Sequence, residues 1–142
     1  MRSYLLIIFI LVIGLNESSR ANTEAESLRQ QAEASYGAGD YQAALARIQQ
    51  AVVLEPANSG YQHLLGKCYG RLAERANPLS AYSLAKKTRV ALEKAVELDS
   101  KNVEALKDLM EYYRQAPGFL GGSQEKARQI RQKLADLQIS PG

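Results

Sequence analysis

The chain has 142 residues, of which 23% are charged, with one cysteine, one histidine and no tryptophan. A single cysteine excludes an internal disulfide and a multi-cysteine zinc site, and a single histidine excludes a His-rich metal centre. Eighteen basic residues against 15 acidic ones give a net charge of +3, without the basic run that marks nucleic-acid binding.

The first residues are typical of a secretory signal. An apolar run covers residues 5–15 and follows Arg2. A run of this length is shorter than the roughly 20 residues of a membrane-spanning helix and fits the about 7–15 apolar residues of a signal peptide. Ser19-Arg20-Ala21 supplies small residues for cleavage after Ala21. We therefore expect residues 1–21 to direct export to the periplasm. The alternative is an uncleaved segment that anchors the chain to the inner membrane.

The remaining residues, 22–142, predict six helices in three hairpins and no strand. Thr23 and Glu26 form a capping box that predicts the start of the first helix, and Gly37-Ala38-Gly39 ends it. Pro56 and Pro117-Gly118 end later helices. The other helix starts follow from residues that commonly cap helices, namely Asp40, Asn58 or Ser59, Asn77 before Pro78, Asn102 and Ser123.

The hairpins share one residue pattern over 25–58, 59–102 and 103–139. Its members are Gly39-Asp40-Tyr41, Ala44, Ala51 and Leu54-Glu55-Pro56, then Leu65-Gly66, Tyr69, Leu92, Ala95 and Leu98-Asp99, then Ala105, Leu109, Tyr112 and Ala127. The pattern resembles the tetratricopeptide repeat (TPR), including small exported bacterial proteins of that family. The resemblance implies an all-α fold of antiparallel helical hairpins, stacked as a short right-handed superhelix. Ser35 and Ser100 depart from it, since that family usually has Tyr and Pro there.

Each hairpin of such an array buries its apolar face only against its neighbours. Small residues such as Ala44, Ala51, Gly66 and Ala95 are expected where helices cross closely. In the last helix, which we expect to run to about residue 137, the apolar residues form one narrow stripe of Ala127, Ile130, Leu134 and Leu137. Such a stripe predicts that the array stops at this helix.

Two insertions distinguish this chain from a regular repeat array. The second repeat is ten residues longer, around Asn77-Pro78, which predicts a middle hairpin that is elongated and projects beyond its neighbours. This hairpin itself carries a cluster of cations near its projecting end, namely Arg71, Arg75, Lys86, Lys87 and Arg89. It suits an acidic partner or an anionic membrane surface, although we favour a solvated face and not membrane contact. The second insertion, residues 116–123, either tucks Phe119 and Leu120 against the hairpin or offers them as a docking knob.

The TPR resemblance implies a peptide-binding groove along the first helix of each hairpin. The corresponding residues are Arg29, Glu33, Tyr36, His63, Lys67, Arg71, Lys107, Glu111 and Arg114. His63, Lys67 and Arg71 share one helix face, and with Arg29 and Lys107 they predict a basic groove for a carboxylate or an acidic segment. The clamp that this family uses for chaperone tails is not expected, because Gln30, Leu64 and Asp108 stand where it has asparagine. A plain solvated surface is the alternative.

The sequence offers no basis for catalysis, for a cofactor or for a metal. His63 and Cys68 lie on different faces of one helix, so they are not expected to pair. Cys68 is expected to be a buried, inert thiol, the alternatives being an intermolecular or redox role. We therefore expect a non-enzymatic adaptor or scaffold that binds a peptide or partner subunit in the cell envelope. The alternative is a structural subunit, packed permanently in an envelope or secretion complex through the elongated hairpin and residues 116–123.

Overall fold

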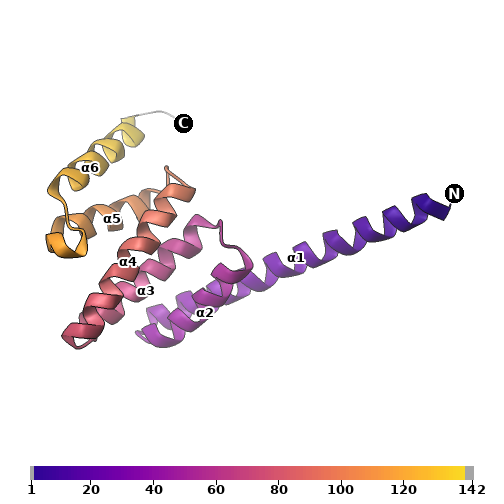
Figure 1. The fold of residues 1–142 in the computed structure, drawn as a ribbon, viewed down its shortest axis with the longest axis horizontal. Helices are drawn as coiled ribbons and strands as arrows, with labels where there is room; N and C mark the ends of the chain where they lie inside the picture. Colours follow the sequence, from indigo (N-terminus) through magenta and orange to yellow (C-terminus); the bar gives the residue numbers. More distant parts are fainter. Residues whose placement is uncertain (1, 140–142) are drawn as a thin grey trace.

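The structure is a computed structural model that describes the backbone of residues 2–139 and the side chains of residues 17–138. Every regular element in this part is a helix, so the all-α prediction is confirmed. The elements are α1 (Arg2–Gly37), α2 (Tyr41–Leu54), α3 (Ser59–Arg75), α4 (Pro78–Leu98), α5 (Val103–Gln115), the 3₁₀ helix η1 (Gly118–Leu120) and α6 (Gln124–Ile139). They pair as antiparallel hairpins α1–α2, α3–α4 and α5–α6, which stack in chain order (Figure 1).

The predicted caps start the helices that follow α1. The side chains of Asp40, Asn58, Asn77 and Asn102 each accept a hydrogen bond from the backbone N–H three residues on. Ser123 does the same for the N–H of Lys126 at 3.2 Å. Asn58, and not Ser59, caps α3. These bonds satisfy backbone donors that a helix start leaves without a partner, which explains why the boundaries could be predicted.

The predicted capping box at Thr23 and Glu26 is wrong. Helix α1 runs without a break from Arg2 to Gly37, so the N–H groups near residue 23 already have partners within the helix. The Thr23 hydroxyl instead donates to the carbonyl of Ser19 at 2.9 Å. The expected cleavage position after Ala21 also lies inside this helix. The apolar run 5–15 lies outside the residues whose side chains are described.

Two apolar clusters hold the hairpins together. The larger one joins α1, α2 and α3, and its innermost large residue is Ile48, which is fully buried. The smaller one joins α4, α5 and α6 through Leu92, Leu109, Tyr113 and Ala127. The predicted small residues at helix crossings, Ala44, Ala51, Gly66 and Ala95, are all buried. Among the described residues, no helix is long and apolar enough to span a membrane.

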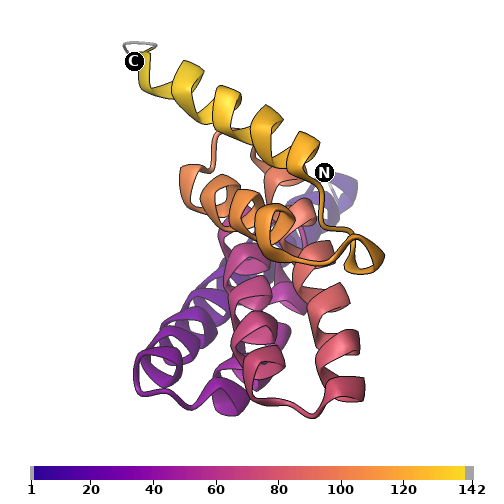
Figure 2. The same cartoon turned by 90° about the vertical axis from the view of Figure 1, so that its left-hand side faces the viewer.

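The middle hairpin is elongated as predicted. Helices α3 and α4 have 17 and 21 residues, against 14 in α2 and 13 in α5. The hairpin extends past α5, but it does not project beyond the first hairpin, since its turn lies beside the turn between α1 and α2 (Figure 2). Arg75, at the end of α3, donates to the carbonyl of Gly39 in that turn at 3.4 Å. There the Arg75 guanidinium lies 4.5 Å from the Tyr41 ring centroid. The turn of the first hairpin therefore flanks the end of α3.

Candidate functional site

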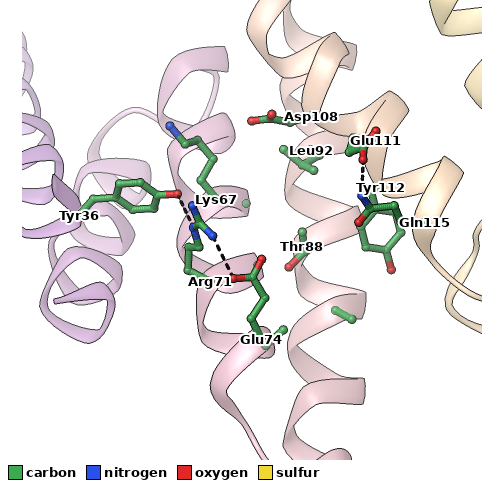
Figure 3. A pocket seen from close by; sticks show the side chains of 14 residues that line it. Tyr36, Lys67, Arg71, Glu74, Thr88, Leu92, Asp108, Glu111, Tyr112 and Gln115 are labelled. Atoms are coloured by element: carbon green, nitrogen blue, oxygen red, sulfur yellow. Dashed lines mark hydrogen bonds and ion pairs between the residues drawn. The ribbon is translucent and has the colours of Figure 1, made fainter. Parts of the chain in front are cut away.

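Helices α1, α3 and α5 line one face of the stack, and this face holds a cavity of about 690 Å³, hereafter the main cavity. Figure 3 shows Lys67, Arg71 and Glu74 of α3 on one side and Glu111, Tyr112 and Gln115 of α5 on the other. Thr88 and Leu92 of α4 lie between these walls, at the floor of the cavity. Tyr36 of α1 closes the far end beside α3.

The floor of the main cavity is open because small residues of α3 face α4. Gly66, Gly70 and Ala73 of α3 lie opposite Ala85, Thr88 and Leu92 of α4. A Cβ on Gly66 would lie 2.9 Å from Cδ2 of Leu92, so the close helix crossing requires glycine there. A Cβ on Gly70 would meet Cγ2 of Thr88 at 3.6 Å, an ordinary contact. Packing therefore explains Gly66, whereas Gly70 leaves space that a side chain would occupy.

The α3 wall of the main cavity is cationic and bordered by tyrosine. Arg71 donates from Nε to the hydroxyl of Tyr36 at 3.3 Å and from Nη1 to Glu74 at 3.0 Å. These two hydrogen bonds raise the pKa of Arg71. The ammonium of Lys67 lies 4.8 Å from the centroid of the Tyr36 ring, a cation–π contact. Within the described part of the chain, Lys67 forms no salt bridge.

The α5 wall of the main cavity carries carboxylates. Arg114 donates from Nε to Glu111 at 2.8 Å, and this hydrogen bond lowers the pKa of Glu111. Asp108 lies 2.6 Å from Nε2 of His63, which joins α3 to α5 across the groove. The main cavity therefore has unlike walls, because Lys67 and Arg71 outnumber Glu74 on α3 whereas Asp108 and Glu111 are the charged lining residues on α5.

A smaller hollow of about 440 Å³, hereafter the side recess, continues the groove between α1 and α3. Arg29 lies in it and pairs with Glu26 at 2.6 Å and with Glu33 at 2.5 Å. The hydrogen bond from Arg29 lowers the pKa of Glu26 to about 2. Lys67 lines both the side recess and the main cavity, so it stands where the two meet.

The predicted groove residues divide between these two hollows. Tyr36, Lys67, Arg71 and Glu111 line the main cavity, and Arg29, Glu33, His63 and again Lys67 line the side recess. Lys107 and Arg114 line neither hollow. Lys107 pairs with Glu104 at 3.0 Å, and Arg114 pairs with Glu111. Sequence reasoning missed the floor, and the glycines at positions 66 and 70, one helical turn apart, were the available signal.

The prediction of a basic groove needs correction. Arg29, Arg71, Lys107 and Arg114 each pair with a carboxylate on their own helix, and His63 contacts Asp108. Spacings of three and four residues along a helix bring these partners together, so the cationic stripe is largely neutralised. Lys67 is the exception in the groove.

The cationic cluster of the middle hairpin is only partly neutralised. Arg71 pairs with Glu74 at 3.0 Å and Arg89 with Glu93 at 3.1 Å. The ammonium groups of Lys86 and Lys87 lie 5.5 and 5.6 Å from the ring centroids of Tyr82 and Tyr69 and have no carboxylate partner among the described residues.

Cys68 lies inside the larger apolar cluster and is fully buried. Burial raises the pKa of its thiol to about 11, which disfavours the reactive thiolate. Among the described residues no three His, Cys, Asp or Glu side chains are grouped so that they could hold a metal ion.

Comparison with known proteins identifies the fold. No family model and no curated protein matches the sequence. Several solved structures match along most of the chain. The second TPR of Spaghetti (RPAP3) bound to the HSP90 peptide SRMEEVD has a TM-score of 0.68 at 15% identity, covering 86% of this chain and 98% of that one.

The fold is that of a TPR domain. The first TPR of Spaghetti (RPAP3), bound to the same peptide, has a TM-score of 0.65 at 16% identity and covers 84% of this chain and 85% of that one. The Arabidopsis OM64 TPR domain has a TM-score of 0.52 at 18% identity, covering 82% of this chain and 98% of that one. At these identities the likeness concerns the fold alone.

Proposed function

We propose that this protein is a non-enzymatic adaptor that binds a peptide, or an extended segment of a partner protein, in the groove formed by α1, α3 and α5. The observation that carries this proposal is the main cavity, which is open to solvent along the same face as the side recess. TPR folds are generally protein-interaction domains without catalytic activity, and the two Spaghetti domains hold a peptide.

The floor of the main cavity supports binding over a merely solvated face. Gly70 lies within α3, where glycine costs about 1 kcal/mol relative to alanine. The neighbouring residues leave room for a side chain at this position, so packing against α4 does not explain why it is glycine and not alanine. A cavity floor that admits the side chain of a ligand gives a reason for glycine at this position.

The walls favour a ligand with an acidic group directed at α3. Exposed ion pairs such as Arg71 with Glu74 contribute only about 0–1 kcal/mol, so a carboxylate of a ligand can displace Glu74 at little cost. Lys67 already lacks a carboxylate partner in the described structure. The Spaghetti peptide SRMEEVD is also acidic near its end. The ligand of this chain is expected to differ from it, because Leu64 is buried and Asp108 contacts His63.

The proposed place of action is the cell envelope. This rests on the sequence alone, through the apolar run 5–15 and the small residues Ser19 and Ala21. Retention of the N-terminal segment as an anchor would still leave the groove on the exported side. The mass of the protein isolated from the envelope decides between cleavage and anchoring.

The test of the proposed function is a pull-down from envelope extract with quantitative mass spectrometry. Gly70→Leu fills the main cavity and is expected to reduce capture of the specific partner at least tenfold. Gly37→Leu is the matched control, since nothing lies within 4 Å of a Cβ at Gly37 and the residue lines neither hollow. Equal capture by the wild type and Gly70→Leu contradicts the proposal.

A charge reversal tests the acidic ligand separately. Lys67→Glu is expected to weaken capture roughly tenfold or more, because the new carboxylate at position 67 repels the acidic group of the ligand. Lys107→Glu is the control, since Lys107 lies on the same side of the stack but lines neither hollow. If both reversals have the same effect, the ligand is attracted by net charge and not by the main cavity.

A further inference from the structure

The two insertions of this chain meet on the surface and form one patch. Leu79 and Phe119 are 83% and 75% exposed, and Tyr82 is 42% exposed. The rings of Tyr82 and Phe119 stack, with centroids 6.3 Å apart and an interplanar angle of 13°. Leu79 and Tyr82 are three residues apart on α4 and so share its surface. We name these three residues the aromatic tip; none of them lines the main cavity or the side recess.

The loop that carries Phe119 is held firmly, so the exposure of this ring is built into the fold. The hydroxyl of Tyr112 donates to the carbonyl of Leu120 at 2.9 Å, and the N–H of Gly122 donates to the carbonyl of Pro117 at 3.1 Å. A Cβ on Gly122 would lie 1.7 Å from the carbonyl oxygen of Ala116, which only glycine avoids. These bonds fix the loop to the end of α5, and η1 lies beside α4 (Figure 2). The side chain of Phe119 remains exposed.

The surroundings of the aromatic tip have a one-sided charge. Residues 76–85 and 115–124, which contribute its side chains, contain no charged residue. The flanking charges on the middle hairpin without an ion-pair partner among the described residues are Arg75, Lys86 and Lys87. The carboxylates nearby are paired, Glu74 with Arg71, Glu93 with Arg89, Glu111 with Arg114 and Glu125 with Arg128. The ammonium of Lys86 lies 5.5 Å from the centroid of the Tyr82 ring. An exposed apolar patch with a cationic border is suited to an anionic partner.

The aromatic tip is open to solvent. Residues 77–80, at the turn of the middle hairpin next to Tyr82, are all exposed. Aromatic and aliphatic side chains beside lysines are the combination that enters the headgroup region of a bilayer while the ammonium groups meet anionic lipids. We propose that the aromatic tip binds the surface of a membrane that contains anionic phospholipids. This goes beyond the peptide-binding groove, which the tip leaves free.

The N-terminal segment does not account for such binding. Figure 1 places the start of α1 and the turn between α3 and α4 at opposite ends of the molecule. Insertion of residues 5–15 into a bilayer therefore does not by itself bring the aromatic tip to the same surface. A test has to report on the tip itself, in the full chain.

The absence of tryptophan from the chain provides such a test. In Phe119→Trp the indole is the single reporter, and its emission is recorded with vesicles of phosphatidylcholine alone or with about one quarter phosphatidylglycerol. We expect a blue shift with the anionic vesicles only. Adding Lys86→Glu is expected to raise the lipid concentration needed for that shift about five- to tenfold. Val53→Trp is the matched control, because Val53 is 80% exposed but lies on α2.

Three results overturn the proposal. The first is an unchanged emission of Phe119→Trp with anionic vesicles. The second is an equal shift in Val53→Trp or with phosphatidylcholine alone, which means that the tip has no special affinity. The third is evidence for a protein interface in place of a membrane. Such evidence is an emission shift that depends on protein concentration without lipid. It is also given by capture of an envelope protein that Phe119→Ser abolishes, when vesicles leave the emission of Phe119→Trp unchanged.

Discussion

Gly66 and Gly70 make it possible to separate helix propensity from packing in one helix. Both lie within α3 and face α4, and both can be changed to alanine. Alanine in place of glycine within a helix contributes about 0.8–1 kcal/mol to the free energy of unfolding. The same substitution at the two positions therefore starts from the same expected gain.

The surroundings of the new methyl group give the two variants opposite signs. At Gly70 the Cβ meets Thr88 at an ordinary 3.6 Å, so Gly70→Ala is expected to stabilise by roughly 0.5–1 kcal/mol. At Gly66 the Cβ would lie 2.9 Å from Cδ2 and 3.4 Å from the backbone nitrogen of Leu92. Cγ of Leu92 lies only 3.0 Å from the same position and cannot move away by a rotation of the terminal methyl groups, and the side chain is 3% exposed and packs in one cluster with Leu109 and Tyr113. Overpacking of this kind costs about 1–3 kcal/mol, so Gly66→Ala is expected to destabilise by up to about 2 kcal/mol.

The assay is urea unfolding of both variants and the wild type, followed by circular dichroism at constant protein concentration. The expected order of stability is Gly70→Ala, wild type, Gly66→Ala, with at least about 1 kcal/mol between the two variants. In thermal unfolding this corresponds to a difference of several degrees. A Gly66→Ala variant as stable as Gly70→Ala refutes the argument that the α3–α4 crossing requires glycine at 66 and leaves space at 70.

Three further predictions concern the loop, the cysteine and the groove. Gly122→Ala is expected to destabilise the protein by about 2 kcal/mol or more, measured by urea unfolding, because its methyl group collides with the Ala116 carbonyl; an unchanged midpoint contradicts this. Alkylation of Cys68 at pH 8 is expected to be at least about 100-fold slower in the folded than in the unfolded protein, since a pKa of about 11 leaves little thiolate; equal rates contradict its burial. NMR titration is expected to show Glu26 ionised down to about pH 2. Since the folded pKa lies below the unfolded one, the stabilisation is present above the unfolded pKa near 4.5 and is lost as the pH falls towards 2. Arg29→Ala is expected to raise this pKa, because the hydrogen bond from Arg29 is its largest cause, and an unchanged titration contradicts that assignment.

Local signals in the sequence account for the correct part of the predicted fold. Capping residues such as Asn77 and Asn102 act within one turn of their own helix, so their neighbours in the sequence suffice to assign them. Thr23 shows the limit of this reasoning, because its role depends on whether the preceding residues are helical. The small residues at helix crossings could also be predicted, since their spacing follows the repeat.

In the groove, too, the sequence predicts which residues share a helix face, and it misses features that depend on neighbouring helices. The sequence correctly placed Lys67 and Arg71 on one face of a helix, but it predicted a basic groove because it counted cations without their partners. Glu74, one turn after Arg71, neutralises it. The floor formed by Thr88 was missed, since it depends on which residues of α4 lie opposite α3.

Composition, local hydrogen bonding and periodicity are enough to predict the later helices, their pairing into hairpins and the small number of residues suited to catalysis or metal binding. Where space remains between the helices follows only from their packing. The main cavity exists because Gly70 lies opposite Thr88, residues that are 18 positions apart in the chain. The stacking of Phe119 on Tyr82 likewise joins two insertions that have no relation in the sequence. Contacts of this kind depend on how elements cross, and crossing is set by the packing of whole faces.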